Sequence, residues 1–108
     1  MLPAAIDPRL AEACELVASD LGTPRPLCAL AAAVGAGERT LSRLFRDEFG
    51  MSYPQWRTRL RVFEAMILLA GGTAVTETAH RCGWATTSSF IDTFQRTMGR
   101  TPGAYRAS

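Results

Sequence analysis

The sequence contains no lysine, only one histidine and three cysteines, and its apolar runs are short. The most apolar run, residues 65–70, is far too short for a membrane-spanning helix, which needs about 20 residues. The cysteines form no CxxC pair, and His80 is the single histidine, so no metal-binding spacing is present. We therefore expect no membrane span, no metal and no cofactor.

The chain also lacks the residue sets that most enzymes need. It has no Ser-His-Asp set, no glycine-rich phosphate loop and no pair of carboxylates at a catalytic spacing, so catalysis is not expected. Residues 1–9 lack the basic start and apolar stretch of a signal peptide, which indicates a cytoplasmic protein. In that compartment Cys14, Cys28 and Cys82 are expected to be reduced and buried.

All twelve basic residues are arginines, and they are unevenly distributed. Residues 1–36 carry two arginines and four acids, whereas residues 37–108 carry ten arginines and six acids. The planar guanidinium group suits bidentate contacts to phosphate or guanine. A general preference for arginine codons would give the same composition. Only the positions of the arginines can distinguish this explanation from binding to phosphate or guanine.

An eight-residue phrase occurs twice, forty-nine residues apart: GMSYPQWR at 50–57 and GRTPGAYR at 99–106. Glycines, aromatics and arginines match between the copies, and Phe45 pairs with Phe94 upstream of the phrase. With an offset one residue smaller, Gly35 pairs with Gly83 and Ala31 with Ala79. Matches over roughly twenty-five residues indicate a duplicated structural unit.

Apolar periodicity and capping residues predict helices and no strand. The predicted helices cover about residues 8–21, 27–34, 38–49, 52–70, 75–82 and 86–98, with a terminal turn or helix at 102–105. Gly22 is expected to end the first helix, and Ser52 to cap the fourth. Along 52–70 we expect one buried apolar stripe, formed by Trp56, Leu60, Phe63, Ile67 and Ala70.

Each copy reads as a short helix with a central alanine, a glycine turn and a longer helix with a buried phenylalanine. That order predicts a helix-turn-helix, because the helices cross closely only over a small side chain. The predicted fold class is all-α, with two helix-turn-helix subdomains joined by a long linker helix and about seven helices in total. The predicted parts are an N-terminal lobe at 1–51, a linker helix at 52–71 and a C-terminal lobe at 72–108.

Three arginines line the outward face of the predicted helix at 38–49. Arg39, Arg43 and Arg46 follow the spacing i, i+4, i+7, on the side opposite the apolar residues. Three cations on one stripe repel one another, and a polyanion relieves that repulsion. The alternative is a solvated face on which Asp47 and Glu48 neutralise the arginines.

The ending GWATTSSFIDTFQRTMGRTPGAYR, together with the duplicated helix-turn-helix, resembles the DNA-binding domain of the AraC/XylS family of bacterial transcription regulators. The most specific matches are Gly83, Trp84, Phe94, Gly99, Pro102, Tyr105 and Arg106, and the run RLRVFEAMILL at 59–69 is similar to the family's connecting helix. The resemblance covers nearly the whole chain, from about residue 7 to residue 106.

The resemblance implies sequence-specific binding of double-stranded DNA, with the second helix of each lobe in one of two successive major grooves. A connecting helix of 52–70 is about 27 Å long, comparable with a duplex turn of about 34 Å once the lobes are added. The implied base contacts are Arg39, Ser42, Arg43, Thr87, Ser88, Ser89, Ile91 and Asp92. The implied phosphate contacts are Thr40, Arg46, Arg57, Arg59, Arg61, Gln95 and Arg96.

Within these sets, Arg43 is the residue expected to bind a guanine, and the first lobe is expected to supply most of the specificity. Asp92 stands where family members often have a basic residue, and phosphate would repel it. The resemblance also implies a nucleoid-associated protein and contact with RNA polymerase. Many relatives carry a separate effector-sensing or dimerising domain, so the chain is either a part of such a protein, with an effector-binding domain outside it, or a complete small regulator. A helical module that binds a protein of the transcription machinery instead of DNA is the alternative that the sequence leaves open.

Overall fold

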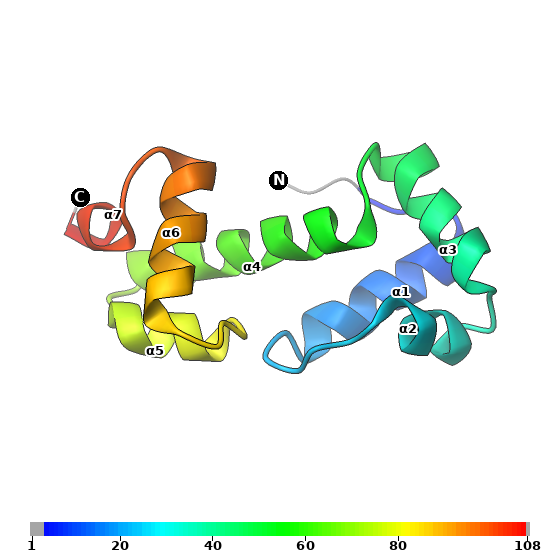
Figure 1. Cartoon of the computed structure of the whole chain (residues 1–108), viewed down its shortest axis with the longest axis horizontal. Helices are drawn as coiled ribbons and strands as arrows, with labels where there is room; N and C mark the ends of the chain where they lie inside the picture. The colour runs from blue at the N-terminus through cyan, green and yellow to red at the C-terminus, as the bar shows by residue number, and fades with distance from the viewer. Residues whose placement is uncertain (1–3, 108) are drawn as a thin grey trace. The chain divides into compact units, whose positions relative to one another are not determined.

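The computed structural model describes residues 4–107, and throughout this range the regular structure is helical. The elements are α1 (Pro8–Ser19), α2 (Leu27–Ala33), α3 (Glu38–Leu44), the π-helical segment η1 (Phe45–Phe49), α4 (Tyr53–Ala70), α5 (Val75–Arg81), α6 (Thr87–Met98) and α7 (Pro102–Ala107) (Figure 1). The predicted all-α class with about seven helices is confirmed. The first helix ends at Ser19, before the predicted stop at Gly22.

Polar side chains cap the N-termini of several helices, as the sequence predicts. The Asp7 carboxylate accepts a hydrogen bond from the Arg9 backbone N–H at 2.8 Å before α1. Ser52 and Gln55 form a reciprocal capping box before α4, because each side chain accepts from the other's backbone N–H, at 3.3 and 2.9 Å. These contacts satisfy amide groups that have no partner inside the helix.

Glycines in left-handed conformation end the two longer helices of the repeats. Gly50 has φ 70° after η1 and Gly99 has φ 78° after α6, and their amides donate to Arg46 and Gln95 at 2.9 and 2.8 Å. A residue with a β-carbon is strained at such φ values. The first glycine of the repeated phrase therefore terminates a helix in both copies.

The chain divides into two packed units, Met1–Leu60 and Arg61–Ser108. The first unit has a core in which Leu10, Leu41 and Phe45 are fully buried, and the Phe45 ring lies 5.5 Å from the Trp56 ring, measured between centroids. Because Trp56 closes this core in the first repeat, the repeated phrase contributes packing as well as a helix stop.

The second unit repeats this packing around α6. Phe90 and Phe94 are fully buried, and the rings of Phe94 and Tyr105 lie 5.7 Å apart between centroids. Tyr105 occupies the position in the second phrase that Trp56 occupies in the first, forty-nine residues earlier. The two aromatic residues therefore pack against a buried phenylalanine in their own copy.

The predicted apolar stripe of α4 is wrong in its second half. Trp56 and Leu60 are buried in the core of the first unit, but Phe63 and Ile67 are 36% and 52% exposed. The buried residues beyond Leu60 are Val62, Ala65 and Leu69, which belong to the core of the second unit. At about 100° per residue, Leu60 and Val62 point roughly 200° apart, so the buried face of the helix changes between them.

The units divide α4 between them, since the boundary between them falls at residues 60 and 61. The three-part organisation into 1–51, 52–71 and 72–108 treats the whole helix as a linker, and it stays a prediction. Among residues 4–107, no helix is both long and apolar enough to cross a membrane.

Candidate nucleic-acid interface

The first unit contains a helix-turn-helix formed by α2 and α3. Ala31 is 2% exposed on the buried face of α2, Gly35 has φ 70° in the turn, and the Ala36 amide donates to the Ala31 carbonyl at 3.0 Å. The small side chain of Ala31 allows α2 and α3 to pack closely, and the glycine permits the tight turn. This arrangement leaves the opposite face of α3 exposed.

The second unit contains the same arrangement in α5 and α6 (Figure 1). Ala79 is 2% exposed, Gly83 has φ 85°, and the Trp84 amide donates to the Ala79 carbonyl at 3.0 Å. The matched alanine, glycine and hydrogen bond show that the sequence repeat corresponds to two copies of one local fold.

The outer face of α3 and η1 presents the predicted arginine stripe. Arg39, Arg43 and Arg46 are exposed, Ser42 is half-buried beside them, and Leu41 on the opposite side is fully buried. An open depression follows this face and is lined by Leu27, Glu38, Arg39, Ser42, Arg43, Arg46 and Asp47. The helix therefore brings the first predicted set of base-contacting residues together on one accessible surface.

Local acids do not neutralise this stripe by ion pairing. The Glu48 carboxylate instead accepts hydrogen bonds from the backbone N–H groups of Ile6 and Asp7, at 2.6 and 3.2 Å. Within residues 4–107, neither Asp47 nor Glu48 lies within 4.0 Å of an arginine nitrogen of the stripe. The alternative in which these two acids pair with the arginines is not what the structure shows.

The outer face of α6 carries the second predicted set. Ser88, Ser89 and Asp92 are exposed, whereas Thr87 and Ile91 are half-buried. The Asp92 carboxylate forms an ion pair with Arg96 at 3.2 Å, one turn along the helix, and both side chains are more than 70% exposed. Such an exposed pair adds only a few tenths of a kcal/mol to helix stability, but it offsets the charge of Asp92.

The longer helices of the two copies carry opposite charges at equivalent positions. An offset of forty-nine residues aligns Arg43 with Asp92 and Asp47 with Arg96. Asp92 and Arg96 form an ion pair, and here the acid precedes the arginine along the helix. This is the preferred order for an i, i+4 pair. The first helix consequently keeps an exposed cation where the second has a carboxylate in an ion pair.

Two arginines of the predicted phosphate set make contacts inside their own units. Arg57 donates from Nη2 to the Leu21 carbonyl at 3.2 Å, and Arg61 donates to the carbonyls of Cys82 and Gly83 at 2.9 and 2.7 Å. These hydrogen bonds place both guanidinium groups against backbone carbonyls, and the phosphate contacts of the two residues stay predictions. The other members of the predicted phosphate set are exposed: Thr40, Arg46, Arg59, Gln95 and Arg96.

The repeated phrase could have predicted the internal hydrogen bond of Arg57. Its counterpart Arg106 donates to the Gly72 and Thr73 carbonyls at 2.8 and 3.0 Å, just beyond the end of α4. Arg57 reaches Leu21 in the same way, just beyond the end of α1. An arginine that recurs in the phrase closing each copy thus holds a helix end in place, a role that the sequence analysis missed.

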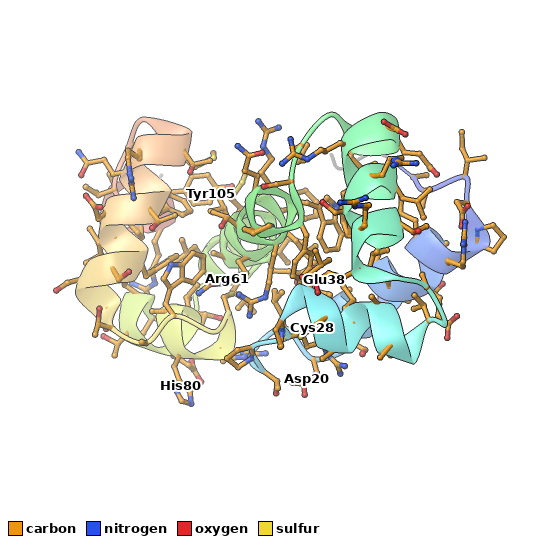
Figure 2. The ribbon with its side chains drawn as sticks, turned by 45° about the vertical axis from the view of Figure 1, so that its right-hand side comes forward. Asp20, Cys28, Glu38, Arg61, His80 and Tyr105 are labelled. Atoms are coloured by element: carbon orange, nitrogen blue, oxygen red, sulfur yellow. The ribbon has the colours of Figure 1, made fainter. Side chains whose placement is uncertain are left out.

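The cysteines and the histidine form no second site in the described part of the chain. Cys82 is buried and Cys14 is half-buried, but Cys28 is exposed, so the prediction of a buried thiol is wrong there. Cys28 is the second residue of α2. His80 points outward from α5 (Figure 2), and no group of three or more potential metal ligands occurs within residues 4–107.

Comparisons with known proteins agree with this geometry. A family model described as a helix-turn-helix domain matches residues 30–108. The HTH-type transcriptional regulator NimR of Escherichia coli is 41% identical over 70 residues, which cover 65% of this chain and 26% of NimR. The HTH-type transcriptional activator RhaR of Yersinia pseudotuberculosis is 37% identical over 70 residues, covering 64% of this chain and 24% of RhaR. The chain spans about a quarter of the length of these relatives.

Solved structures give the same result for the fold. An AraC-type transcriptional regulator from Chromobacterium violaceum has a TM-score of 0.87 and 28% identity, and the match covers 93% of this chain and 90% of that one. The DNA-binding domain of AdpA, solved with a target DNA, has a TM-score of 0.84 and 33% identity, with 94% and 92% covered. The chain therefore belongs to the AraC/XylS family of helix-turn-helix transcription regulators.

Proposed function

We propose that this chain binds double-stranded DNA sequence-specifically as part of a bacterial transcription regulator, with α3 and α6 entering successive major grooves. The observation that carries the proposal is the exposed stripe of Arg39, Arg43 and Arg46 on the outer face of a helix-turn-helix. Among residues 4–107 no acid forms an ion pair with these three arginines. Such a stripe favours a polyanion, and an α-helix fits the major groove of B-DNA.

In the first unit, Arg43 is the proposed guanine-reading residue. It lies in the middle of the stripe, where its guanidinium group can bind O6 and N7 of one guanine in a bidentate contact. Arg39 and Ser42 line the same depression and are the proposed neighbouring base contacts. Arg46 and Thr40 are exposed beside them and are proposed to bind phosphates, as is Arg59 on α4.

In the second unit we expect base recognition to be weaker and to use other kinds of side chain. The short hydroxyls of Thr87, Ser88 and Ser89 and the partly buried Ile91 offer few strong contacts to bases. Asp92 is the proposed acceptor for a cytosine amino group, while Gln95 and Arg96 are proposed to bind phosphate. Because Arg96 also pairs with Asp92, contact of Arg96 with DNA would compete with that ion pair.

Selection of bound sequences from a random duplex pool tests the proposal. We expect an enriched site with two subsites about 10 to 10.5 base pairs apart, one of them strongly selected and containing a guanine. Selection with the Arg43→Ala variant should lose that guanine, whereas selection with Asp92→Ala should change the weaker subsite only. Equal loss of preference at both subsites in either variant would contradict the assignment of residues to subsites.

Salt dependence separates DNA binding from the alternative of a protein-interaction module. Each phosphate neutralised by an arginine gives a slope of about −0.9 in a plot of log affinity against log salt concentration. We expect the selected duplex to give a slope several times as steep, because several arginines neutralise phosphates. A flat dependence, with tight binding to a protein of the transcription machinery, would favour the module instead.

The family resemblance extends the proposal to the whole protein. Contact with RNA polymerase, an effector-binding domain outside this chain and a cytoplasmic, nucleoid-associated location are proposed on that basis. Fluorescence imaging of the tagged regulator in bacterial cells should show signal over the nucleoid, and an even distribution through the cell would argue against that location.

A further inference from the structure

Arg61 on α4 makes three contacts with the turn between α5 and α6. Its Nε donates to the Cys82 carbonyl at 2.9 Å and its Nη2 to the Gly83 carbonyl at 2.7 Å. Its guanidinium carbon lies 3.8 Å from the centroid of the Trp84 ring. Figure 2 shows the Arg61 side chain beside this turn. One planar group thus both caps carbonyls at the end of α5 and stacks on an aromatic ring.

The turn that Arg61 contacts directly precedes α6 and packs against it. Trp84 is 7% exposed, and its ring lies 4.8 Å from the ring of Phe90, which is fully buried on the inner face of α6. The Trp84 amide also donates a hydrogen bond to the Ala79 carbonyl, which holds it in place. A chain of contacts therefore leads from Arg61 through Trp84 to the side of α6 opposite Ser88 and Asp92.

The first unit has no matching device among its described residues. The residue aligned with Trp84 is Ala36, and no described arginine donates to the carbonyls of Val34 and Gly35 in the equivalent turn. The contact is therefore a feature of the second unit only. Its loss should affect α6 and leave α3 unchanged.

We propose that Arg61 is a positioning residue for DNA reading by α6: it fixes the α5–α6 turn and thereby the orientation of Ser88 and Asp92, and it binds no phosphate itself. The proposal rests on the proposed function, in which α6 reads a base-pair subsite. Arg61 thus affects the base specificity of α6, although it lies far in sequence from Ser88 and Asp92.

The first experiment measures duplex binding by Arg61→Lys and Arg61→Gln against Arg59→Gln. Arg59 is exposed, lies on the same helix and is a proposed phosphate contact, so it is the matched control. We expect both Arg61 variants to lose about tenfold in discrimination among base pairs under α6, with an unchanged salt slope and unchanged discrimination under α3. The control should instead lower the salt slope by about 0.9 with discrimination unchanged.

A lower salt slope in Arg61→Gln with equal effects on both subsites would show that Arg61 binds phosphate, and would overturn the proposal. Unchanged discrimination under α6 in both variants would overturn it as well. Lysine keeps the charge but lacks the planar guanidinium that donates from Nε and Nη2 and stacks on the Trp84 ring, so the two variants separate charge from geometry.

The second experiment does not depend on DNA. Amide hydrogen exchange of the free protein should become faster at Trp84 and Phe90 in Arg61→Lys than in the wild type and in Arg59→Lys, with exchange in α3 unchanged. If the wild type bound no duplex, the proposed function would fail, and the exchange data would still decide whether Arg61 holds the turn. Unchanged exchange at both amides would overturn the proposal.

Discussion

At the scale of single residues, the environments of the three thiols differ. Burial raises the pKa of Cys14 to about 12 and that of Cys82 to about 11, whereas Cys28 is exposed. Because the thiolate is the nucleophile, we expect iodoacetamide to modify Cys28 in the native protein near neutral pH and to leave Cys14 and Cys82 intact. Mass spectrometry of the peptides checks this. Labelling of Cys82 as fast as Cys28 would contradict the packing of the second core.

The same burial predicts how stability depends on alkaline pH. An unfolded cysteine ionises around its ordinary pKa of 9.0, while buried Cys82 keeps its proton up to about pH 11. Below pH 9 both states are protonated, so the thiol has no effect. As the pH rises from 9 towards 11, the unfolded state alone loses its proton, and the free energy of unfolding should fall. Denaturant titrations should show a shallower fall for Cys82→Ala than for the wild type.

The residues that sequence reasoning placed correctly are those whose conformation or partner is local. Asp7 accepts from an amide two residues away, and Gly50 and Gly99 take φ values that other residues avoid. The internal hydrogen bonds of Arg57 and Arg61 were not predicted, because their carbonyl partners lie 36 and 21 residues away. Spacing on a helix shows which way an arginine points, but only the packed fold shows what it meets.

At the scale of elements, η1 and α6 each end at a glycine in left-handed conformation. Around Gly50 and Gly99 an added β-carbon meets nothing within 4 Å, so substitution by alanine strains the backbone only. We expect Gly50→Ala and Gly99→Ala each to lower the free energy of unfolding by about 1 to 2 kcal/mol. Gly103, which also has open space but lies inside α7 without a positive φ, is the matched control.

Urea denaturation of the three glycine variants makes the comparison. Gly103→Ala should be neutral or slightly stabilising, because alanine favours a helix. A cost for Gly103→Ala equal to that of the other two would mean that the left-handed conformation is not the source of the strain.

The helix α4 was predicted correctly in extent and wrongly in its buried face. A single apolar stripe is the natural expectation for one amphipathic helix, but this helix contributes to two cores and changes its buried face between Leu60 and Val62. Periodicity over the whole helix cannot reveal such a change, because each half has only three buried positions. The exposed Phe63 and Ile67 continued the stripe by coincidence of spacing.

Two aliphatic residues on α4 test this correction. Leu69 is 1% exposed in the second core and Ile67 is 52% exposed. We expect Leu69→Ala to cost about 2 to 5 kcal/mol of unfolding free energy, and Ile67→Ala to change it by less than about 0.5 kcal/mol. Thermal or urea unfolding of the two variants gives the comparison, and similar costs would restore the original stripe.

At the scale of the whole molecule, the duplication gives two copies of one fold with different chemistry. Both copies share the alanine, the turn glycine and the closing glycine, so the architecture was predictable from the repeat. Their outer faces differ, since Arg43 aligns with Asp92. Fold-level similarity to relatives therefore predicts how each helix is held, whereas the exposed side chains have to be examined in this chain itself.

The central claim is that the outer face of α3 reads DNA bases through Arg43. The most direct measurement combines Arg43→Ala with replacement of the selected guanine in the first subsite, and compares the four duplex affinities at one salt concentration. We expect a coupling of about 1 to 3 kcal/mol between the side chain and that base pair, so that the variant no longer distinguishes the two duplexes. If the variant binds more weakly but discriminates between them as well as the wild type, Arg43 does not read the base, and the account is contradicted.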